Sequence, residues 1–151
     1  MIRSRILRAS RPRLRTVLPL IVSAIICSYE MRTAGNPSQL RLALDKSSIA
    51  NGWDDVAFVN VSVLDDQGTV VPNAANLIKF NVEGAGFVAA VDSANSNSHE
   101  PYQAQQRQAF QGMCLALIKA NADKGKIKIT ATSPHLQSAS TELTVAGASR
   151  P

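Results

Sequence analysis

The chain has 151 residues, of which 45% are hydrophobic and 18% charged, and its formal net charge is +5 at pH 7. This length fits one domain with a buried core, since domains most often hold roughly 100–200 residues. The positive charge comes from the six arginines of residues 1–28, because the rest of the chain holds ten basic residues against eleven acidic ones. A basic surface across the domain is therefore not expected, and we predict no nucleic-acid partner.

Residues 1–28 have the form of a secretory leader, with an arginine-rich start and a short apolar run at residues 17–27 (VLPLIVSAIIC). The run is too short to span a bilayer easily. Ile25 and Ile26 stand where a cleavage site would need small residues. Two interpretations stay open: a signal peptide that engages the membrane export machinery, giving a periplasmic or extracellular protein, or a spurious start joined to a domain fragment. The next parts are predicted as a linker (29–38), a single sandwich domain (39–146) and a tail (147–151).

From residue 39 the apolar residues recur with a period of two, as in strands with one buried face, whose successive side chains point to opposite sides. This alternation predicts strands at residues 39–44, 57–63, 78–82, 127–132 and 140–145. Turn residues separate them, including the Asn-Gly pair at 51–52. Residues 69–71 are expected to form a short extended piece that ends at Pro72, because proline donates no ladder hydrogen bond.

Two further stretches are nearly continuously apolar. Residues 87–91 predict a strand that is covered on both faces. Residues 113–120 fit a helix or a strand by pattern alone, and their short length and the preceding Gly112 favour a strand. Cys114 lies in this run and is expected to be a small core residue rather than a disulfide partner of Cys27. Trp53 is expected to cap the edge of the fold.

About seven short strands, with turn signals every 8–12 residues or so and almost no helical periodicity, predict an all-β fold, an antiparallel β-sandwich of immunoglobulin type. One long loop interrupts the pattern at residues 93–112 (SANSNSHEPYQAQQRQAFQG). A loop of this length is uncommon, since most connections run to about 4–6 residues. It is therefore either functional or a packed surface loop. Its candidate contact residues are His99, Glu100, Tyr102, Arg107 and Phe110.

Several motifs together resemble the C-terminal immunoglobulin-like domain of bacterial beta-galactosidases of glycoside hydrolase family 2. The resemblance covers residues 29–145, and its most specific part is the spacing in the long loop from SHEP at 98–101 to RQAFQG at 107–112. The Asn-Gly turn and the alternating valines of residues 59–63 are weaker, because many bacterial adhesin-like domains share them. The resemblance implies that beta-galactosides are hydrolysed by two glutamates of a barrel domain that precedes this one.

A barrel of that kind needs about 250 residues, so the family's catalytic glutamates have no position in this sequence. We therefore expect no catalytic residue and no enzymatic activity from this chain. The resemblance implies a non-catalytic accessory domain, encoded as a fragment, whose partners are neighbouring glycosidase domains or carbohydrate. The alternative is an exported, stand-alone module of adhesin-like or carbohydrate-binding type.

The polar residues of the loop allow a chemical role and a structural one. A glycosidase needs two carboxyl groups about 5–9.5 Å apart, and Glu100 could approach Asp92 or Glu83, but a single loop on a sandwich offers little cleft. With two histidines in the chain and no close Cys/His spacing, we predict no metal and no other cofactor. Instead we expect His99 and Glu100 to hold the loop, through backbone hydrogen bonds or an ion pair with Arg107.

The two aromatic residues of the loop leave a choice open. Tyr102 and Phe110 either stack on a sugar ring or anchor an Ω-type loop on the end of the sandwich. His135 follows Ser133-Pro134 and is expected to be an exposed turn residue.

Overall fold

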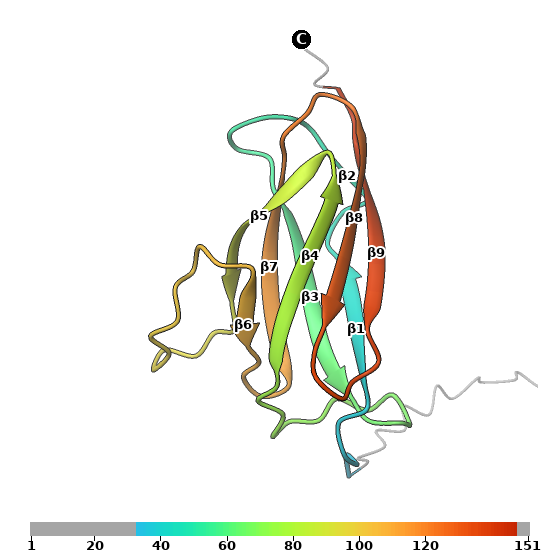
Figure 1. The fold of residues 1–151 in the computed structure, drawn as a ribbon, viewed down its shortest axis with the longest axis vertical. Helices are drawn as coiled ribbons and strands as arrows, with labels where there is room; N and C mark the ends of the chain where they lie inside the picture. The colour runs from blue at the N-terminus through green and yellow to red at the C-terminus, as the bar shows by residue number, and fades with distance from the viewer. Residues whose placement is uncertain (1–32, 148–151) are drawn as a thin grey trace, which may run out of the picture. The chain divides into compact units, whose positions relative to one another are not determined.

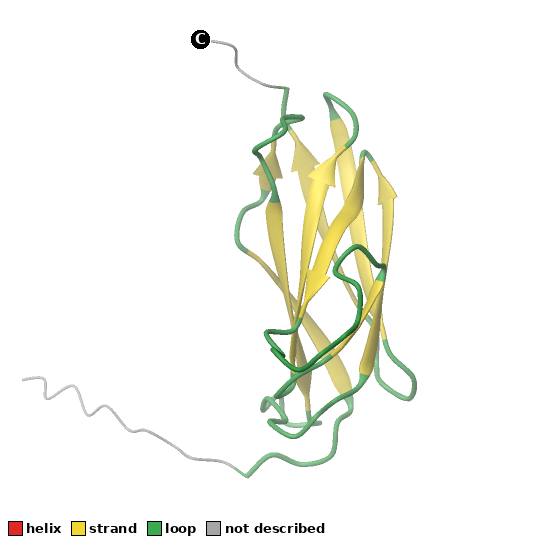
Figure 2. Ribbon diagram, turned by 90° about the vertical axis from the view of Figure 1, so that its left-hand side faces the viewer, coloured by secondary structure: helices red, strands yellow, loops and turns green. Residues whose placement is uncertain are grey.

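The computed structural model describes residues 33–147. The predicted leader (1–28), the first residues of the predicted linker and the end of the predicted tail lie outside the described residues. Within residues 33–147 every regular element is a strand (Figure 2). This part of the chain accordingly holds no helix that could cross a membrane.

The strands form two stacked sheets (Figure 1). Sheet A has the order β1-β3-β7-β5, and sheet B has the order β2-β9-β8-β4-β6. All pairs are antiparallel except β2 with β9. The strands are β1 (Gln39–Leu44), β2 (Ser48–Ile49), β3 (Ala57–Leu64), β4 (Leu77–Gly84), β5 (Gly86–Asp92), β6 (Gln106–Gln108), β7 (Met113–Ala120), β8 (Gly125–Thr132) and β9 (Ala139–Val145). The predicted antiparallel sandwich is therefore confirmed.

The sandwich has two strands more than the seven or so predicted, namely β2 with two residues and β6 with three. Both lie at the edges of sheet B. A period of two cannot be recognised in so few residues, so the alternation of apolar and polar side chains gave no signal for them.

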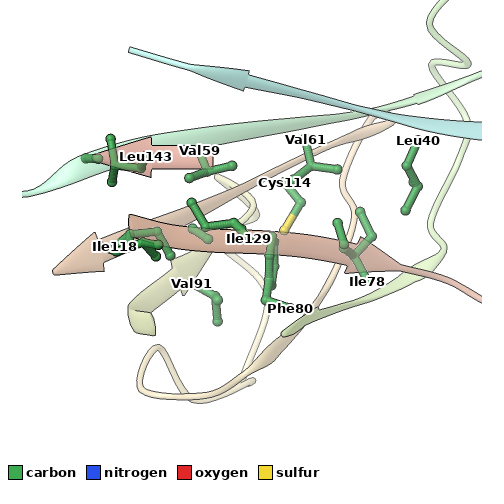
Figure 3. Close-up of a cluster of buried hydrophobic side chains, with 14 of the residues drawn as sticks. Leu40, Val59, Val61, Ile78, Phe80, Val91, Cys114, Ile118, Ile129 and Leu143 are labelled. Carbon is green, nitrogen blue, oxygen red and sulfur yellow. The ribbon is translucent and has the colours of Figure 1, made fainter. Parts of the chain in front are cut away.

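The core lies between the sheets and is built from the alternating apolar residues (Figure 3). In β3, for example, Ala57, Val59, Val61 and Val63 are all fully buried. The predicted strand at residues 113–120 is confirmed as β7, and every second residue of it is buried. Cys114 is one of these and points into the cluster (Figure 3), which confirms it as a core residue.

The extended piece predicted at 69–71 is confirmed: Val70 forms an antiparallel bridge with Leu64, and the piece ends before Pro72. Two local predictions are wrong. The strand predicted at 87–91 is not covered on both faces, since β5 is an edge strand whose Phe87 is 46% exposed. Trp53 does not cap the fold, because it is 88% exposed. The exposure of these residues depends on which strands become neighbours in the fold, and the alternation of apolar and polar residues along one strand does not contain that information.

His135 is exposed, as predicted, and has a positive backbone φ of 64° in the turn between β8 and β9. The topology also fixes where the long loop lies. Because β5 ends sheet A and β6 ends sheet B, the chain between them passes from the edge of one sheet to the edge of the other.

Candidate functional site

The long loop is packed along the open edge of the sandwich, nearest the viewer in Figure 2. Its backbone is hydrogen-bonded to both sheets. The Val91 N–H of β5 donates to the Tyr102 carbonyl at 2.8 Å, and the Phe80 N–H of β4 donates to the Gln105 carbonyl, also at 2.8 Å. The segment is therefore a packed surface loop, whose backbone is fixed while its exposed side chains stay accessible.

Arg107 is the largest fully buried side chain of the described residues, with 0% exposure. It lies in the middle of β6, where its backbone pairs with that of Ile78 in β4. Ile78 points into the core, and the residue opposite it across an antiparallel pair points to the same face. The register therefore places Arg107 between the two sheets at their open edge. A buried charge of this kind requires hydrogen bonds and opposite charges around it.

The partners of Arg107 come from both ends of the loop. Its Nη1 donates to the Glu100 carbonyl at 2.8 Å, and its Nε donates to Ser93 Oγ at 3.3 Å. Two carboxylates complete the shell: Asp92 Oδ1 lies 3.4 Å from Nη2, and Glu100 Oε2 lies 3.6 Å from Nε. The guanidinium also lies over the ring of Tyr102, 5.1 Å from the ring centroid. One side chain thus links the end of β5, the loop and β6.

Glu100 holds the loop in several ways at once. Besides Arg107, its carboxylate accepts hydrogen bonds from the Gln108 backbone N–H at 3.3 Å and from Ser98 Oγ at 3.2 Å. Glu100 was expected to hold the loop through backbone hydrogen bonds or an ion pair with Arg107, and the structure shows both. The carboxylates of Asp92 and Glu100 remain 40% and 33% exposed, so water screens their attraction to the guanidinium.

His99 does not share this role. Its side chain is exposed, and no hydrogen bond or ion pair joins it to another residue within 33–147. The holding function expected of both residues is thus carried by Glu100. The same part of the chain gathers no group of three His, Cys, Asp or Glu side chains that could hold a metal ion.

The two loop aromatics lie in different settings. Tyr102 is 59% exposed and stacks against Arg107. Phe110 is 39% exposed and begins the tight turn before β7, where its backbone exchanges hydrogen bonds with that of Met113 at 2.9 and 3.0 Å. Gln111 and Gly112 complete this turn with positive φ values of 52° and 74°. Phe110 is therefore a turn residue, and Tyr102 is the aromatic residue of the Arg107 cluster.

Two neighbouring residues complete the surroundings of the site. Ser93 is a buried partner of Arg107 that the sequence did not single out, since serine is common in loops and only the fold brings it to β6. Cys114 lies in the core beneath, where burial raises the pKa of its thiol to about 12. A thiol with so high a pKa stays protonated and unreactive at neutral pH.

Two hollows lie at the surface of the domain. One of about 230 Å³ opens beside Asp92, lined by Asn60, Met113 and Leu115 among others. The other, of about 360 Å³, lies between residues 33–37 and 71–74, where the chain enters the sandwich. Asp65 fastens this entry by accepting the Gly35 N–H at 2.9 Å. That bond and the one from Thr69 lower the pKa of the Asp65 carboxyl below its ordinary value.

Comparison with known proteins gives the context of this loop and sandwich. Residues 40–142 match the family described as glycoside hydrolase family 2 C-terminal domain 5. The chain is 42% identical over 115 residues to the beta-galactosidase BoGH2A of Bacteroides ovatus. It is 32% identical over 71 residues, or 47% of the chain, to a beta-galactosidase of Thermoanaerobacter pseudethanolicus. Among solved structures, a beta-glycosidase from Bacteroides vulgatus matches with a TM-score of 0.73 and 29% identity.

Each of these matches covers a small part of a much longer protein. The Bacteroides ovatus match takes in 76% of this chain and 14% of that enzyme, and the Thermoanaerobacter match takes in 10% of its enzyme. The Bacteroides vulgatus structure is matched over 76% of this chain and 15% of its own. The chain thus corresponds to one domain of these glycosidases.

Proposed function

The chain belongs to the glycoside hydrolase family 2 C-terminal domain 5 family, and from that premise we propose that it is a non-catalytic accessory domain of a family 2 glycosidase acting on beta-galactosides. The observation that carries this proposal is the 42% identity to a beta-galactosidase of which the chain spans 14%. The domain packs against the other domains of such an enzyme, and its long loop contacts carbohydrate at the surface.

The arrangement of the loop carboxylates supports a non-catalytic role. Glycoside hydrolysis uses one carboxyl group as the acid and a second as nucleophile or base, on either side of the sugar bond. Here Asp92 and Glu100 both face a single guanidinium, at 3.4 and 3.6 Å. Their positions are set by Arg107 and not by a shared cleft, so they serve to fix the loop.

Tyr102 is the residue on which the carbohydrate contact depends. Its ring is 59% exposed, and Arg107 fixes its position from the buried side. An aromatic ring with a hydroxyl tip offers an apolar surface and a hydrogen-bonding group together, which suits the apolar face and the hydroxyls of a sugar. Phe110 and His99 lie outside the Arg107 cluster and contribute less to this contact.

Two experiments test the proposal. In the first, residues 32–151, whose described part forms one compact unit by its own contacts, replace the matching segment of the Bacteroides ovatus beta-galactosidase. We expect a soluble chimera that hydrolyses a chromogenic beta-galactoside, whereas the chain 1–151 alone gives no turnover. Turnover by the chain alone that is lost in the Glu100→Gln variant would overturn the non-catalytic role.

The second experiment tests the sugar contact. The chain 1–151 is titrated with lactose and followed by the NMR shifts of the loop amides. We expect shifts at residues 98–107 that the Tyr102→Ala variant loses and that the Phe110→Ala variant, the matched control, retains. Unchanged spectra with lactose, or equal shifts in all three proteins, would remove the carbohydrate contact from the proposed function.

A further inference from the structure

The two outer faces of the sandwich differ in chemistry. On sheet B the outward residues are polar or charged and pair across the strands, Glu83 opposite Lys128 and Lys128 opposite Glu142. An ion pair between Lys126 and Glu142 at 3.4 Å lies on the same face. A sheet face of this composition is typical of one that stays in contact with water.

The outer face of sheet A is apolar over its middle. Register places Phe58 of β3 opposite Leu117 of β7, and Leu117 opposite Ala90 of β5. Phe87 lies further along β5 on the same face and is 46% exposed, while Phe58 is 38% exposed. We call these residues and Met113 and Leu115 of β7 the sheet A patch; it consists of Phe58, Phe87, Ala90, Met113, Leu115 and Leu117. Contiguous apolar surface of this kind marks an interaction site more often than scattered single residues do.

The sequences of β5 and β7 add an independent argument. Strands whose residues are nearly all apolar are typical of sheets covered on both faces. In β5, GFVAAVD, and in β7, MCLALIKA, this pattern holds for most positions. Yet within residues 33–147 only the inner face is covered, and Phe87 and Met113 remain exposed. These sequences thus fit a fold in which a further layer lies on sheet A.

The chemistry of the patch favours a protein surface over the other occupants. The central row of Phe58, Leu117 and Ala90 is apolar, and polar residues flank it on the same face: Asn60 and Asp92 lie opposite Leu115, and Lys119 lies opposite Phe87. An apolar centre with a polar rim is the composition of a protein interface, whereas a sugar needs polar groups for its hydroxyls throughout the contact. The relatives contain further protein that could supply such a surface, since the match covers only 14% and 15% of two of these enzymes. The remaining part of such an enzyme is continuous with this domain and is therefore present at high effective concentration.

Features at the two ends of the patch fit such a partner. At one end Lys119 of β7 donates from its Nζ to the Trp53 carbonyl at 2.7 Å, which holds the loop of Trp53 beside the patch. Trp53 is 88% exposed there, and exposed tryptophan is enriched in protein interfaces. At the other end lies the hollow of about 230 Å³ beside Asp92 and Leu115, which is open to a protruding side chain.

We propose that the sheet A patch is the surface by which this domain docks onto another globular domain of its glycosidase. This docking rests on the proposed function, in which the domain packs against other domains of a glycosidase, and it assigns that packing to the outer face of sheet A. Sheet B stays exposed to water in that assembly.

The test compares the free chain 1–151 with the chimera described above. Hydroxyl-radical labelling followed by mass spectrometry measures the oxidation rates of Phe58, Phe87 and Met113. We expect these rates to fall at least about fivefold in the chimera, because interface cores are packed as densely as protein interiors. Acetylation of Lys79 and Lys128 on sheet B is the control and should proceed equally in both proteins.

A pair of matched variants tests the energetic role of the patch. Phe58→Ser with Phe87→Ser alters sheet A, and Lys79→Ser with Lys128→Ser alters sheet B. In the free chain the sheet A pair should lower the thermal midpoint more than the sheet B pair, because Phe58 and Phe87 are only 38% and 46% exposed and pack against their cross-strand neighbours. That loss is the reference against which the chimera is compared. In the chimera only the sheet A pair should separate the unfolding of this domain from that of the rest, giving two calorimetric transitions in place of one.

Each other outcome has a distinct meaning. An active chimera whose Phe58 and Phe87 are oxidised as fast as in the free chain would overturn this inference and leave the proposed function standing. Failure of every chimera to give active enzyme would overturn the proposed function, and the inference with it. Protection that grows with the concentration of the free chain would assign the patch to a second copy, and protection by lactose would assign it to sugar; both results overturn the docking proposed here.

Discussion

Replacing Arg107 with methionine or alanine separates the two ways in which this side chain stabilises the domain. Methionine keeps most of the buried apolar stem and removes the guanidinium with its bonds to Glu100 and Ser93. Alanine removes the stem as well. The difference between the two variants therefore measures packing, and the difference between methionine and the wild type measures the polar contacts.

The distances set the size of each contribution. Only the bond from Arg107 to the Glu100 carbonyl, at 2.8 Å, is short, and a hydrogen bond from a charged group contributes about 1.5–3 kcal/mol. The ion pairs at 3.4 and 3.6 Å add little, because their carboxylates are 40% and 33% exposed. We expect Arg107→Met to cost about 2 kcal/mol. Arg107→Ala should cost about 4 kcal/mol, since three buried methylenes contribute about 0.8 kcal/mol each.

Urea unfolding followed by far-ultraviolet circular dichroism gives these free energies. The control is Arg41→Met on the exposed face of β1, which should change the free energy of unfolding by less than about 0.5 kcal/mol. Amide hydrogen exchange adds a local measurement at Val91 and Phe80, whose N–H groups donate to the loop. Exchange at both amides should accelerate in Arg107→Met well before the domain unfolds.

One result would refute this reasoning directly. If Arg107→Met were as stable as the wild type and its Val91 and Phe80 amides exchanged at unchanged rates, the arginine would not anchor the loop. The buried guanidinium would then be tolerated rather than stabilising, as happens for some buried ion pairs.

Three further predictions concern the turn, the core thiol and the chain entry. Gly112→Ala should lower the free energy of unfolding by about 3 kcal/mol or more, because its positive φ disfavours a side chain and the added Cβ would meet the Val71 carbonyl at 2.3 Å. The control Gly68→Ala has a φ of +80° but open space around it, and should cost only about 1 kcal/mol. Equal losses in the two variants would contradict the role of the close contact between Gly112 and Val71. In a Cys27→Ser background, Cys114 should react with iodoacetamide at pH 8 only on unfolding, because its native pKa is raised to about 12; rapid labelling of the native chain would show the thiol to be accessible. Because the pKa of Asp65 is lowered in the folded state, this carboxylate contributes stability that is complete above its unfolded pKa of about 3.9 and is lost as the pH falls through its native pKa. Asp65→Asn should therefore lose less stability between pH 7 and pH 3 than the wild type. Parallel plots of unfolding free energy against pH for the two proteins would assign the acid sensitivity to other groups.

Much of the fold follows from local pattern. The valines of β3 and the isoleucines of β8 alternate with polar residues, and burying one face of each strand is the arrangement that such spacing permits. The ion pair of Glu100 with Arg107 was likewise predictable, because opposite charges in one loop with few other partners tend to meet. The exposed position of β5 was not predictable, since it depends on which strands become neighbours.

By itself the sequence determined an all-β sandwich, the inward side of its strands and the loop that marks its family, because these depend on residue order over short distances. The tertiary structure decided the burial of Arg107, since only the pairing of β6 with β4 turns that side chain between the sheets. It also decided that sheet B presents charge while sheet A presents Phe58 and Phe87. A face of a sheet gathers residues from strands far apart in the chain, so its chemistry exists only once those strands are side by side.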